Sequence, residues 1–161
     1  MKKQDIKPVM VYKYASLQLN YVLHEQFKRM SDLPRIIDSH EAVTYFQDHY
    51  KSLSNAQEFF SVMLLSRNNK VLNVSTIGQG NKHSTIVDIS YIVTQALLTG
   101  ANAVILAHNH PSGNHFPSDQ DKDLTSKVQA ALKLIDIQLI DHIILTSDKD
   151  LWYSMATAGE L

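Results

Sequence analysis

The feature that most constrains the fold is a short apolar run that ends in two histidines. Residues Ala103–Ala107 are all apolar, with Gly100 before them and a Pro/Ser/Gly/Asn-rich segment after them. This is typical of a buried strand that ends in a loop. If the strand continues to His110, its alternation sets His108 and His110 on one side. Pro111 favours this, because the residue before a proline is held in extended geometry. The pattern therefore predicts two imidazoles side by side.

A helix is predicted directly after this loop. Ser118, followed three residues later by the acidic Asp121, is typical of a helix N-cap, and the helix would run over residues 119–134. Asp121 begins a stripe with helical spacing that must face the sheet. The other members of this stripe are apolar: Leu124, Val128, Ala131 and Ile135. The carboxylate would therefore point toward the end of the strand that carries the histidines.

Together these residues make a ligand set. Two histidines, one carboxylate and an open fourth position are typical of a catalytic rather than a structural zinc site. We therefore predict one Zn²⁺ ion bound by His108, His110 and Asp121. Nickel or manganese would also suit these ligands, so other divalent metals remain open.

The same residues carry a resemblance to a known family. The order His108-x-His110, seven residues, Ser118, two residues, Asp121 resembles the JAMM signature of the JAB/MPN metalloprotease superfamily. The flanking residues are similar to its bacterial RadC-type branch, from about Ser39 to the C-terminus, above all in Ala107–Gly113, Pro117–Thr125 and Leu139–Ile144. The resemblance implies an α/β fold, the JAB/MPN or cytidine-deaminase-like mixed β-sheet flanked by helices.

The resemblance also implies an activity, the zinc-dependent hydrolysis of amide or isopeptide bonds in a peptide or protein substrate. The family's general base, which activates a metal-bound water, is a glutamate at the start of an early core strand, and Glu58 matches it. Without the resemblance, Glu58 would be interpreted as a solvated residue at a strand start. The family serine stabilises an oxyanion, so the resemblance gives Ser118 that role beside helix capping.

Three other polar residues have open roles. His115 lies in the same loop and is interpreted as a surface residue outside the ligand set. Asp141 and His142 match a pair that recurs in RadC-type proteins. We favour a structural hydrogen-bonding role within a strand for this pair, and the alternative is that it orients a metal ligand.

The composition excludes several other classes of protein. The absence of cysteine excludes disulfides, thiolate metal sites and the zinc deaminases, whose signature contains a cysteine pair. The net charge is -1 and the basic residues are scattered, so charge does not support a nucleic-acid partner, and any DNA binding should be weak and salt-sensitive. No segment has the length of a membrane span and the N-terminus lacks a signal-peptide pattern, so we expect a cytoplasmic protein.

The alternative function is a DNA-repair-associated accessory module of the RadC type, with a metal site that is structural or not catalytically active. RadC-type proteins carry a helix-hairpin-helix module upstream, and the segment before residue 39 is expected to be too short for one. This weakens a DNA-binding function by analogy. The oligomeric state is not indicated.

The length of 161 residues suits one domain. We predict a flexible N-terminal arm over residues 1–13 and a single RadC-like JAB/MPN domain over residues 14–161. Besides the elements above, the pattern predicts strands over residues 17–23, 58–65, 71–77, 137–145 and 151–155. It also predicts a helix capped by Ser39 that ends near Tyr50, and a helix over residues 89–99 capped by Asp88.

Overall fold

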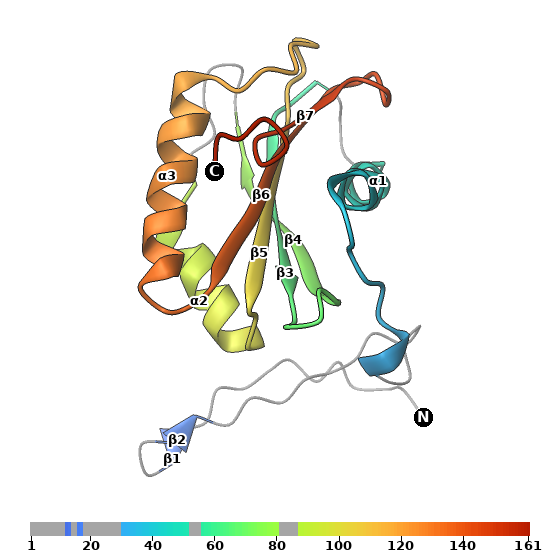
Figure 1. Ribbon diagram of the computed structural model, residues 1–161. Helices are drawn as coiled ribbons and strands as arrows, with labels where there is room; N and C mark the ends of the chain where they lie inside the picture. Colours follow the sequence, from blue (N-terminus) through green and yellow to red (C-terminus); the bar gives the residue numbers. More distant parts are fainter. Residues whose placement is uncertain (1–11, 14–15, 18–29, 52–55, 81–86) are drawn as a thin grey trace, which may run out of the picture. The chain divides into compact units, whose positions relative to one another are not determined.

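The computed structural model describes residues 12–13, 16–17, 30–51, 56–80 and 87–161 (Figure 1). The chain groups into two compact units, Met1–Asp32 and Leu33–Leu161. In the first unit, β1 (Tyr12–Lys13) pairs antiparallel with β2 (Ser16–Leu17), and a 3-10 helix spans Met30–Asp32. The strand predicted over residues 17–23 lies outside the described residues except for Leu17, and the boundary between residues 13 and 14 stays a prediction.

The second unit is built on a mixed five-stranded sheet in the order β4-β3-β5-β6-β7. Its central pair, β5 and β6, is parallel, whereas the other neighbours are antiparallel. The strand bounds are β3 (Phe59–Leu65), β4 (Val71–Gln79), β5 (Ala103–Asn109), β6 (Gln138–Leu145) and β7 (Trp152–Ser154). This confirms the predicted α/β class with a mixed sheet.

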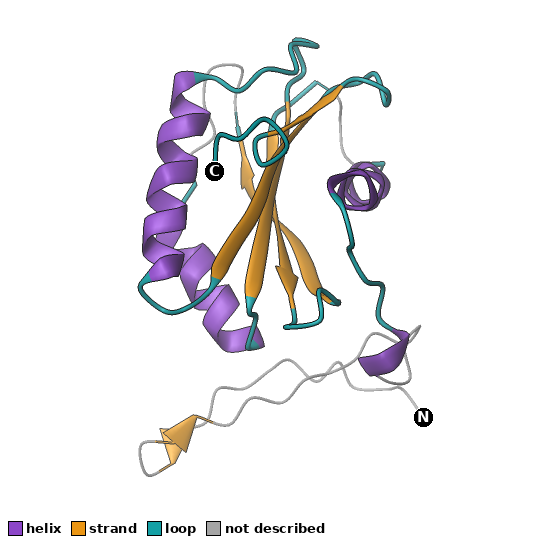
Figure 2. Ribbon diagram, viewed as in Figure 1, coloured by secondary structure: helices purple, strands orange, loops and turns teal. Residues whose placement is uncertain are grey.

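The α-helices of the described residues cover the two faces of this sheet (Figure 2). Helix α1 (Ser39–Tyr50) lies on one face, and α2 (Ile89–Thr99) and α3 (Asp119–Lys133) lie on the other. Asp88 caps α2 as predicted, and Gly100 ends it in the left-handed conformation, with φ 64°, that glycine adopts readily. None of the described helices combines the length and apolar character needed to cross a bilayer.

The N-cap of α1 corrects the sequence prediction by one residue. Asp38, not Ser39, is the cap, since its backbone is extended and its Oδ1 accepts a hydrogen bond from the Glu41 N–H at 2.8 Å. Ser39 lies in the first turn, and its hydroxyl donates to the buried Asp141 carboxylate at 2.9 Å. Either residue type can cap a helix. Asp38 is the cap here because the hydroxyl of Ser39 donates instead to the Asp141 carboxylate, which is distant in sequence.

The central strand β5 positions the functional residues, because it is buried on both faces. Alternate residues of β5 belong to different apolar clusters, one packed on α1 and one packed on α2 and α3. Leu106 belongs to the second cluster. By the alternation of a strand, His108 faces α2 and α3 as well, whereas Asn109 faces α1.

A buried carboxylate ties β6 to α1 and to the residues around β7. Asp141 is 1% exposed, and its Oδ2 accepts from the hydroxyls of Ser39 (2.9 Å) and Ser154 (2.6 Å). Its Oδ1 accepts from the N–H groups of His142 (2.8 Å) and Ala156 (3.0 Å). These four donors compensate a polar group that would be costly to bury alone. The contacts agree with the structural role favoured for Asp141.

Removing this carboxylate should destabilise the fold strongly. In Asp141→Ala one buried N–H group, one half-buried N–H group and two hydroxyls lose this carboxylate as acceptor, so we expect the free energy of unfolding to fall by about 3–5 kcal/mol. Asp141→Asn keeps an oxygen for the two N–H groups and should lose much less. Urea unfolding followed by circular dichroism measures both. Asp123→Ala, which removes an exposed carboxylate on α3, is the control, and an equally small effect of Asp141→Ala would contradict the prediction.

Candidate metal centre

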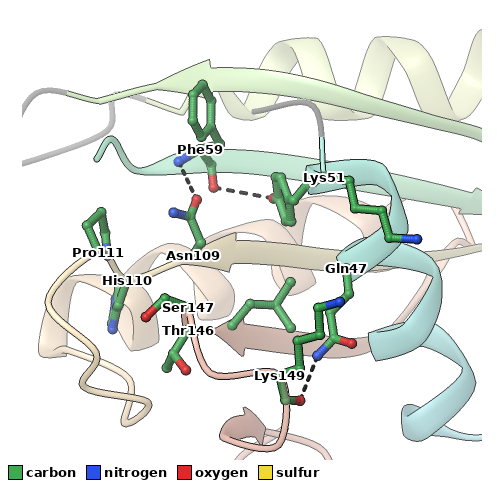
Figure 3. A pocket seen from close by; sticks show the side chains of 11 residues that line it. Gln47, Lys51, Phe59, Asn109, His110, Pro111, Thr146, Ser147 and Lys149 are labelled. Carbon is green, nitrogen blue, oxygen red and sulfur yellow. Dashed lines mark hydrogen bonds between the residues drawn. The ribbon is translucent and has the colours of Figure 1, made fainter. Parts of the chain in front are cut away.

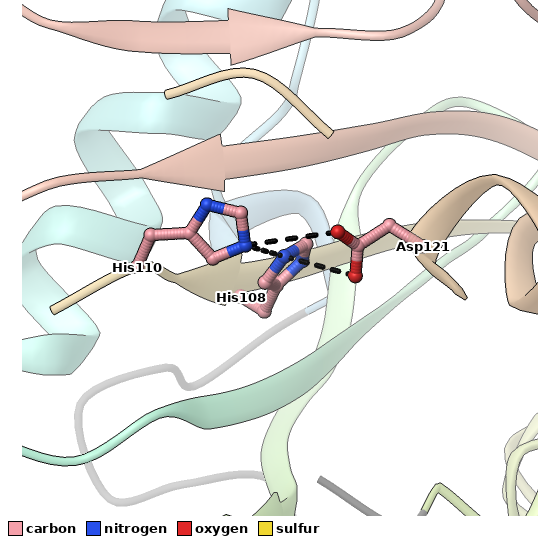
Figure 4. A group of neighbouring side chains, drawn as sticks. All are labelled: His108, His110 and Asp121. Carbon is pink, nitrogen blue, oxygen red and sulfur yellow. Dashed lines mark hydrogen bonds and ion pairs between the residues drawn. The ribbon is translucent and has the colours of Figure 1, made fainter. Parts of the chain in front are cut away.

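Three predicted ligands meet where β5 ends and α3 begins (Figure 4). His108 is the last residue but one of β5 and is fully buried, and His110 follows the strand. Asp121 lies in the first turn of α3. One ligand atom of each residue lies within 4.8 Å of the other two. The structure therefore brings together the three residues that the sequence pattern singled out, and they could hold a metal ion.

The distances within this cluster suit one small ion. The two Nε2 atoms of His108 and His110 are 2.9 Å apart. Asp121 Oδ1 lies 3.2 Å from His108 Nε2, and Asp121 Oδ2 lies 3.6 Å from His110 Nε2. A tetrahedral zinc ion with bonds near 2.1 Å keeps its ligand atoms about 3.4 Å apart. The observed spacing would need only small adjustments to accept such an ion.

The arrangement of lone pairs in the cluster also favours a positive charge between the three residues. His110 Nδ1 lies 2.7 Å from the carbonyl oxygen of Asn114, which can only accept, so a neutral His110 ring has its lone pair on Nε2. That lone pair points at His108 Nε2 and at a carboxylate (Figure 4). A cation at this place would resolve the repulsion, so the donor set fits a divalent metal.

The electrostatics of the two half-buried ligands agree with this interpretation. The hydrogen bond to Asp121 is the main cause that raises the pKa of His110 above its ordinary value. For Asp121, burial by itself would raise the pKa, but the neighbouring imidazoles of His108 and His110 outweigh it and hold the pKa of the carboxyl well below its usual range. The site thus favours an ionised carboxylate and a positive charge beside it.

A capping box orients the Asp121 carboxylate. Ser118 Oγ accepts from the Asp121 N–H at 3.2 Å, which confirms the predicted N-cap. In return Asp121 Oδ2 accepts from the Ser118 N–H at 2.7 Å and from the Ser118 hydroxyl at 2.5 Å. Because the hydroxyl's single proton is donated to Asp121, Ser118 would have to turn before it could donate to an oxyanion. That second role stays a prediction.

Glu58 lies immediately before β3 and is half-buried. The antiparallel register pairs Phe60 with His108, so continuing it by two residues sets Glu58 opposite His110. The rings of Phe60 and His108 stack with centroids 5.9 Å apart, and alternation directs Glu58 toward the same face. Its negative charge also contributes to the raised pKa of His110. The location suits a base beside the cluster, while the role itself stays a prediction.

Two further residues stand behind His108. His142 Nε2 lies 2.9 Å from His108 Nδ1, and Thr125 Oγ1 lies 2.6 Å from His142 Nδ1. His142 is fully buried, and burial is the main cause that lowers its pKa well below the ordinary value, so the ring is neutral at pH 7. For His142, sequence reasoning favoured a structural role and kept the orientation of a ligand as the alternative; the contact with His108 agrees with the alternative. Sequence reasoning missed Thr125. A histidine and an aspartate side by side in a mostly apolar strand were the available signal.

His115 does not join the cluster. Its ring packs against Phe116, with centroids 4.1 Å apart, and lies 6.4 Å from Tyr153. It is half-buried by these aromatic neighbours. This agrees with leaving His115 outside the ligand set, although its environment is more aromatic than that of an isolated surface histidine.

A cavity of about 270 Å³ opens on the other side of the β5 end (Figure 3). Asn109 lines it and holds the beginning of β3, since its Oδ1 accepts from the Phe59 N–H at 2.7 Å and its amide donates to the Gln57 carbonyl at 2.9 Å. The cavity contacts the ligand cluster through His110. Lys149 also lines it. The cavity is therefore lined by polar and apolar side chains together, and it adjoins one ligand directly.

Comparisons with known proteins agree on one family. Residues 36–160 match the family model described as RadC-like JAB domain. A UPF0758 protein of Flavobacterium johnsoniae is 36% identical over 127 residues, which cover 79% of this chain and 54% of that protein. UPF0758 proteins of Pelobacter propionicus and Pseudomonas fluorescens are 31% and 40% identical, covering 87% and 63% of this chain and 61% and 45% of their own lengths. The chain thus spans about half the length of the curated relatives it matches.

Proposed function

Because the chain belongs to the RadC-like JAB domain family, we propose that it is a metal-dependent hydrolase of amide or isopeptide bonds. The observation that carries the proposal is the convergence of two imidazole nitrogens and one carboxylate within 4.8 Å. His108, His110 and Asp121 would hold the ion, with zinc as the favoured metal. Three protein ligands leave one coordination position open, which is the arrangement of catalytic rather than structural zinc.

The residues of the chain would divide the work. A bound divalent metal would polarise the scissile carbonyl and lower the pKa of water to about 7. Glu58 would take a proton from the attacking water and return it to the leaving nitrogen. Ser118 would donate a hydrogen bond from its hydroxyl to the developing oxyanion, once that hydroxyl has turned away from Asp121. The half-buried position of Glu58 next to His110 supports its part.

The cavity bears on the kind of substrate. At about 270 Å³ it is slightly smaller than the usual range for ligand pockets, and it lies open beside His110. This suits a peptide segment laid across the protein surface better than a small molecule enclosed in a pocket. A peptide or protein substrate is therefore part of the proposal.

The experiment combines metal analysis with a substrate screen. Protein stripped with a chelator is supplied with Zn²⁺, Ni²⁺ or Mn²⁺, its bound metal is determined by elemental analysis, and each form is tested on peptide and isopeptide-linked substrates. We expect one ion per chain and hydrolysis that disappears with the chelator and returns with the metal. Metal binding without hydrolysis, together with tight duplex DNA binding at physiological salt, would instead favour the accessory-module function.

A further inference from the structure

A line of buried hydrogen bonds runs from the ligand cluster into the first turns of α3. His108 Nδ1 is 2.9 Å from His142 Nε2, His142 Nδ1 is 2.6 Å from Thr125 Oγ1, and Thr125 Oγ1 donates to the carbonyl oxygen of Asp121 at 2.5 Å. The two histidines are 0% exposed and Thr125 is 2% exposed. Water is therefore kept away from every link, and each group depends on its neighbour in the line.

The last acceptor sets the direction of the whole line. A carbonyl oxygen can only accept, so the single hydroxyl proton of Thr125 goes to Asp121. Thr125 Oγ1 must then accept from His142 Nδ1–H. A neutral imidazole has one N–H and one lone pair, so His142 Nε2 accepts from His108 Nδ1–H. The reverse direction would leave two oxygen atoms 2.5 Å apart with no proton between them.

We propose that His142 and Thr125 are positioning residues that hold His108 in the tautomer whose Nε2 lone pair faces the ligand cluster. In the other tautomer a proton would occupy Nε2, the atom that lies 3.2 Å from Asp121 Oδ1. Metal binding would then require that proton to move first. The inference rests on the metal-binding part of the proposed function and not on hydrolysis.

His110 reaches the same tautomer by a different device. Its Nδ1 has the backbone carbonyl of Asn114 as acceptor, at 2.7 Å. A backbone carbonyl fixes the direction of a histidine directly, and metal-binding histidines commonly use such a partner. The Nδ1 of His108 points into the protein interior, where the ring of His142 is its acceptor. Because an imidazole nitrogen can either donate or accept, the direction of this hydrogen bond is fixed by Thr125 and the carbonyl of Asp121.

The packing of His142 and Thr125 explains their burial but does not require one direction of the hydrogen bonds. His142 packs edge-on against Phe60, with centroids 5.4 Å apart, and Thr125 also lies 3.6 Å from Met155 Sδ. Packing alone would be equally well served by either tautomer of His142. Only the site at His108 Nε2 depends on which nitrogen carries the proton, so the tautomer is the quantity to measure.

The test removes the threonine hydroxyl without changing side-chain shape. In Thr125→Val the His142 Nδ1–H loses its acceptor, so His142 should turn to its Nε2–H form and force a proton onto His108 Nε2. We expect the affinity for Zn²⁺, measured by chelator competition, to fall about 10–100-fold. Thr125→Ser keeps the hydroxyl and should restore affinity to within a few-fold of the wild type. ¹⁵N NMR of the histidine rings in metal-free protein at alkaline pH should show His108 Nε2 unprotonated in the wild type and protonated in Thr125→Val.

Thr99→Val is the matched control. Thr99 also donates to a helix carbonyl four residues earlier, that of Gln95, at 2.8 Å, but it is the last residue of α2, and its hydrogen bonds among the described residues go to α2 carbonyls. Its replacement should leave both Zn²⁺ affinity and the His108 tautomer unchanged. A wild-type His108 protonated on Nε2, or a Thr125→Val protein with unchanged tautomer and affinity, would overturn the inference. If the wild type bound no Zn²⁺, the proposed function would fail, while the tautomer measurement would still decide the inference.

Discussion

Replacement of Glu58 by glutamine is expected to leave metal content unchanged and to reduce hydrolysis by about 10²–10⁴-fold. The substitution keeps the size and the hydrogen-bonding capacity of the side chain and deletes only the base. Glu58 would act twice, first on the attacking water and then on the leaving nitrogen, so the upper part of the range is expected. Glu58 is not among the described residues that form the ligand cluster. The ion should therefore stay bound in Glu58→Gln.

The measurement needs both quantities from one preparation. Bound metal is determined by elemental analysis, and the hydrolysis rate is measured with a substrate from the screen. Glu41→Gln is the control, because Glu41 is also half-buried but lies on α1, where its carboxylate accepts from the Ile37 N–H at 2.8 Å. Full activity in Glu58→Gln with normal metal content would show that the base lies elsewhere. Loss of metal would make Glu58 a ligand or a group that orients one.

Replacement of Asp121 by asparagine should have the opposite pattern, with metal lost first and activity lost as a consequence. A neutral amide in place of the carboxylate removes the only negative ligand and leaves two imidazoles. We expect Zn²⁺ affinity to fall by at least about 100-fold, which is the upper limit for groups that merely support a ligand. Excess Zn²⁺ should therefore recover part of the activity in Asp121→Asn but none in Glu58→Gln.

The Asp121→Asn protein should keep its fold, so a loss of metal can be attributed to the missing ligand. Asparagine retains an oxygen that can accept from the Ser118 N–H, so most of the capping box remains. Asp119→Asn is the control within the same helical turn, since Asp119 is exposed and outside the cluster. Isothermal titration with Zn²⁺ compares the three proteins. Wild-type affinity in Asp121→Asn would remove Asp121 from the ligand set.

The parts of the site that are local in sequence could be predicted. His108 and His110 follow from strand alternation, and Asp121 follows from a helix cap three residues upstream. Each of these rules links residues within one element. The apolar stripe of α3 then predicts which side of the helix faces the sheet, because the stripe must be buried.

The parts that depend on pairing between distant segments could not be predicted. His142 reaches His108 because β6 lies parallel to β5 with a register shift between Val104 and Ile105, and no local pattern reports such a shift. The prediction of Ser39 as the N-cap of α1 was wrong for a similar reason. Ser39 and Asp38 are equally good caps by type, and only the buried Asp141 carboxylate, contributed by β6, distinguishes them.

The double use of Asp121 has a consequence for how an ion would leave. The same carboxylate closes the capping box of α3 and completes the ligand cluster, so one helical turn serves both purposes. Helix ends fray far more often than helix centres or central strands open. Opening that single turn would move Asp121 away from the ligand cluster while His108 stays buried in the sheet. The residence time of the ion would then follow the lifetime of one helical turn, and a protein that resists unfolding could still exchange its metal rapidly.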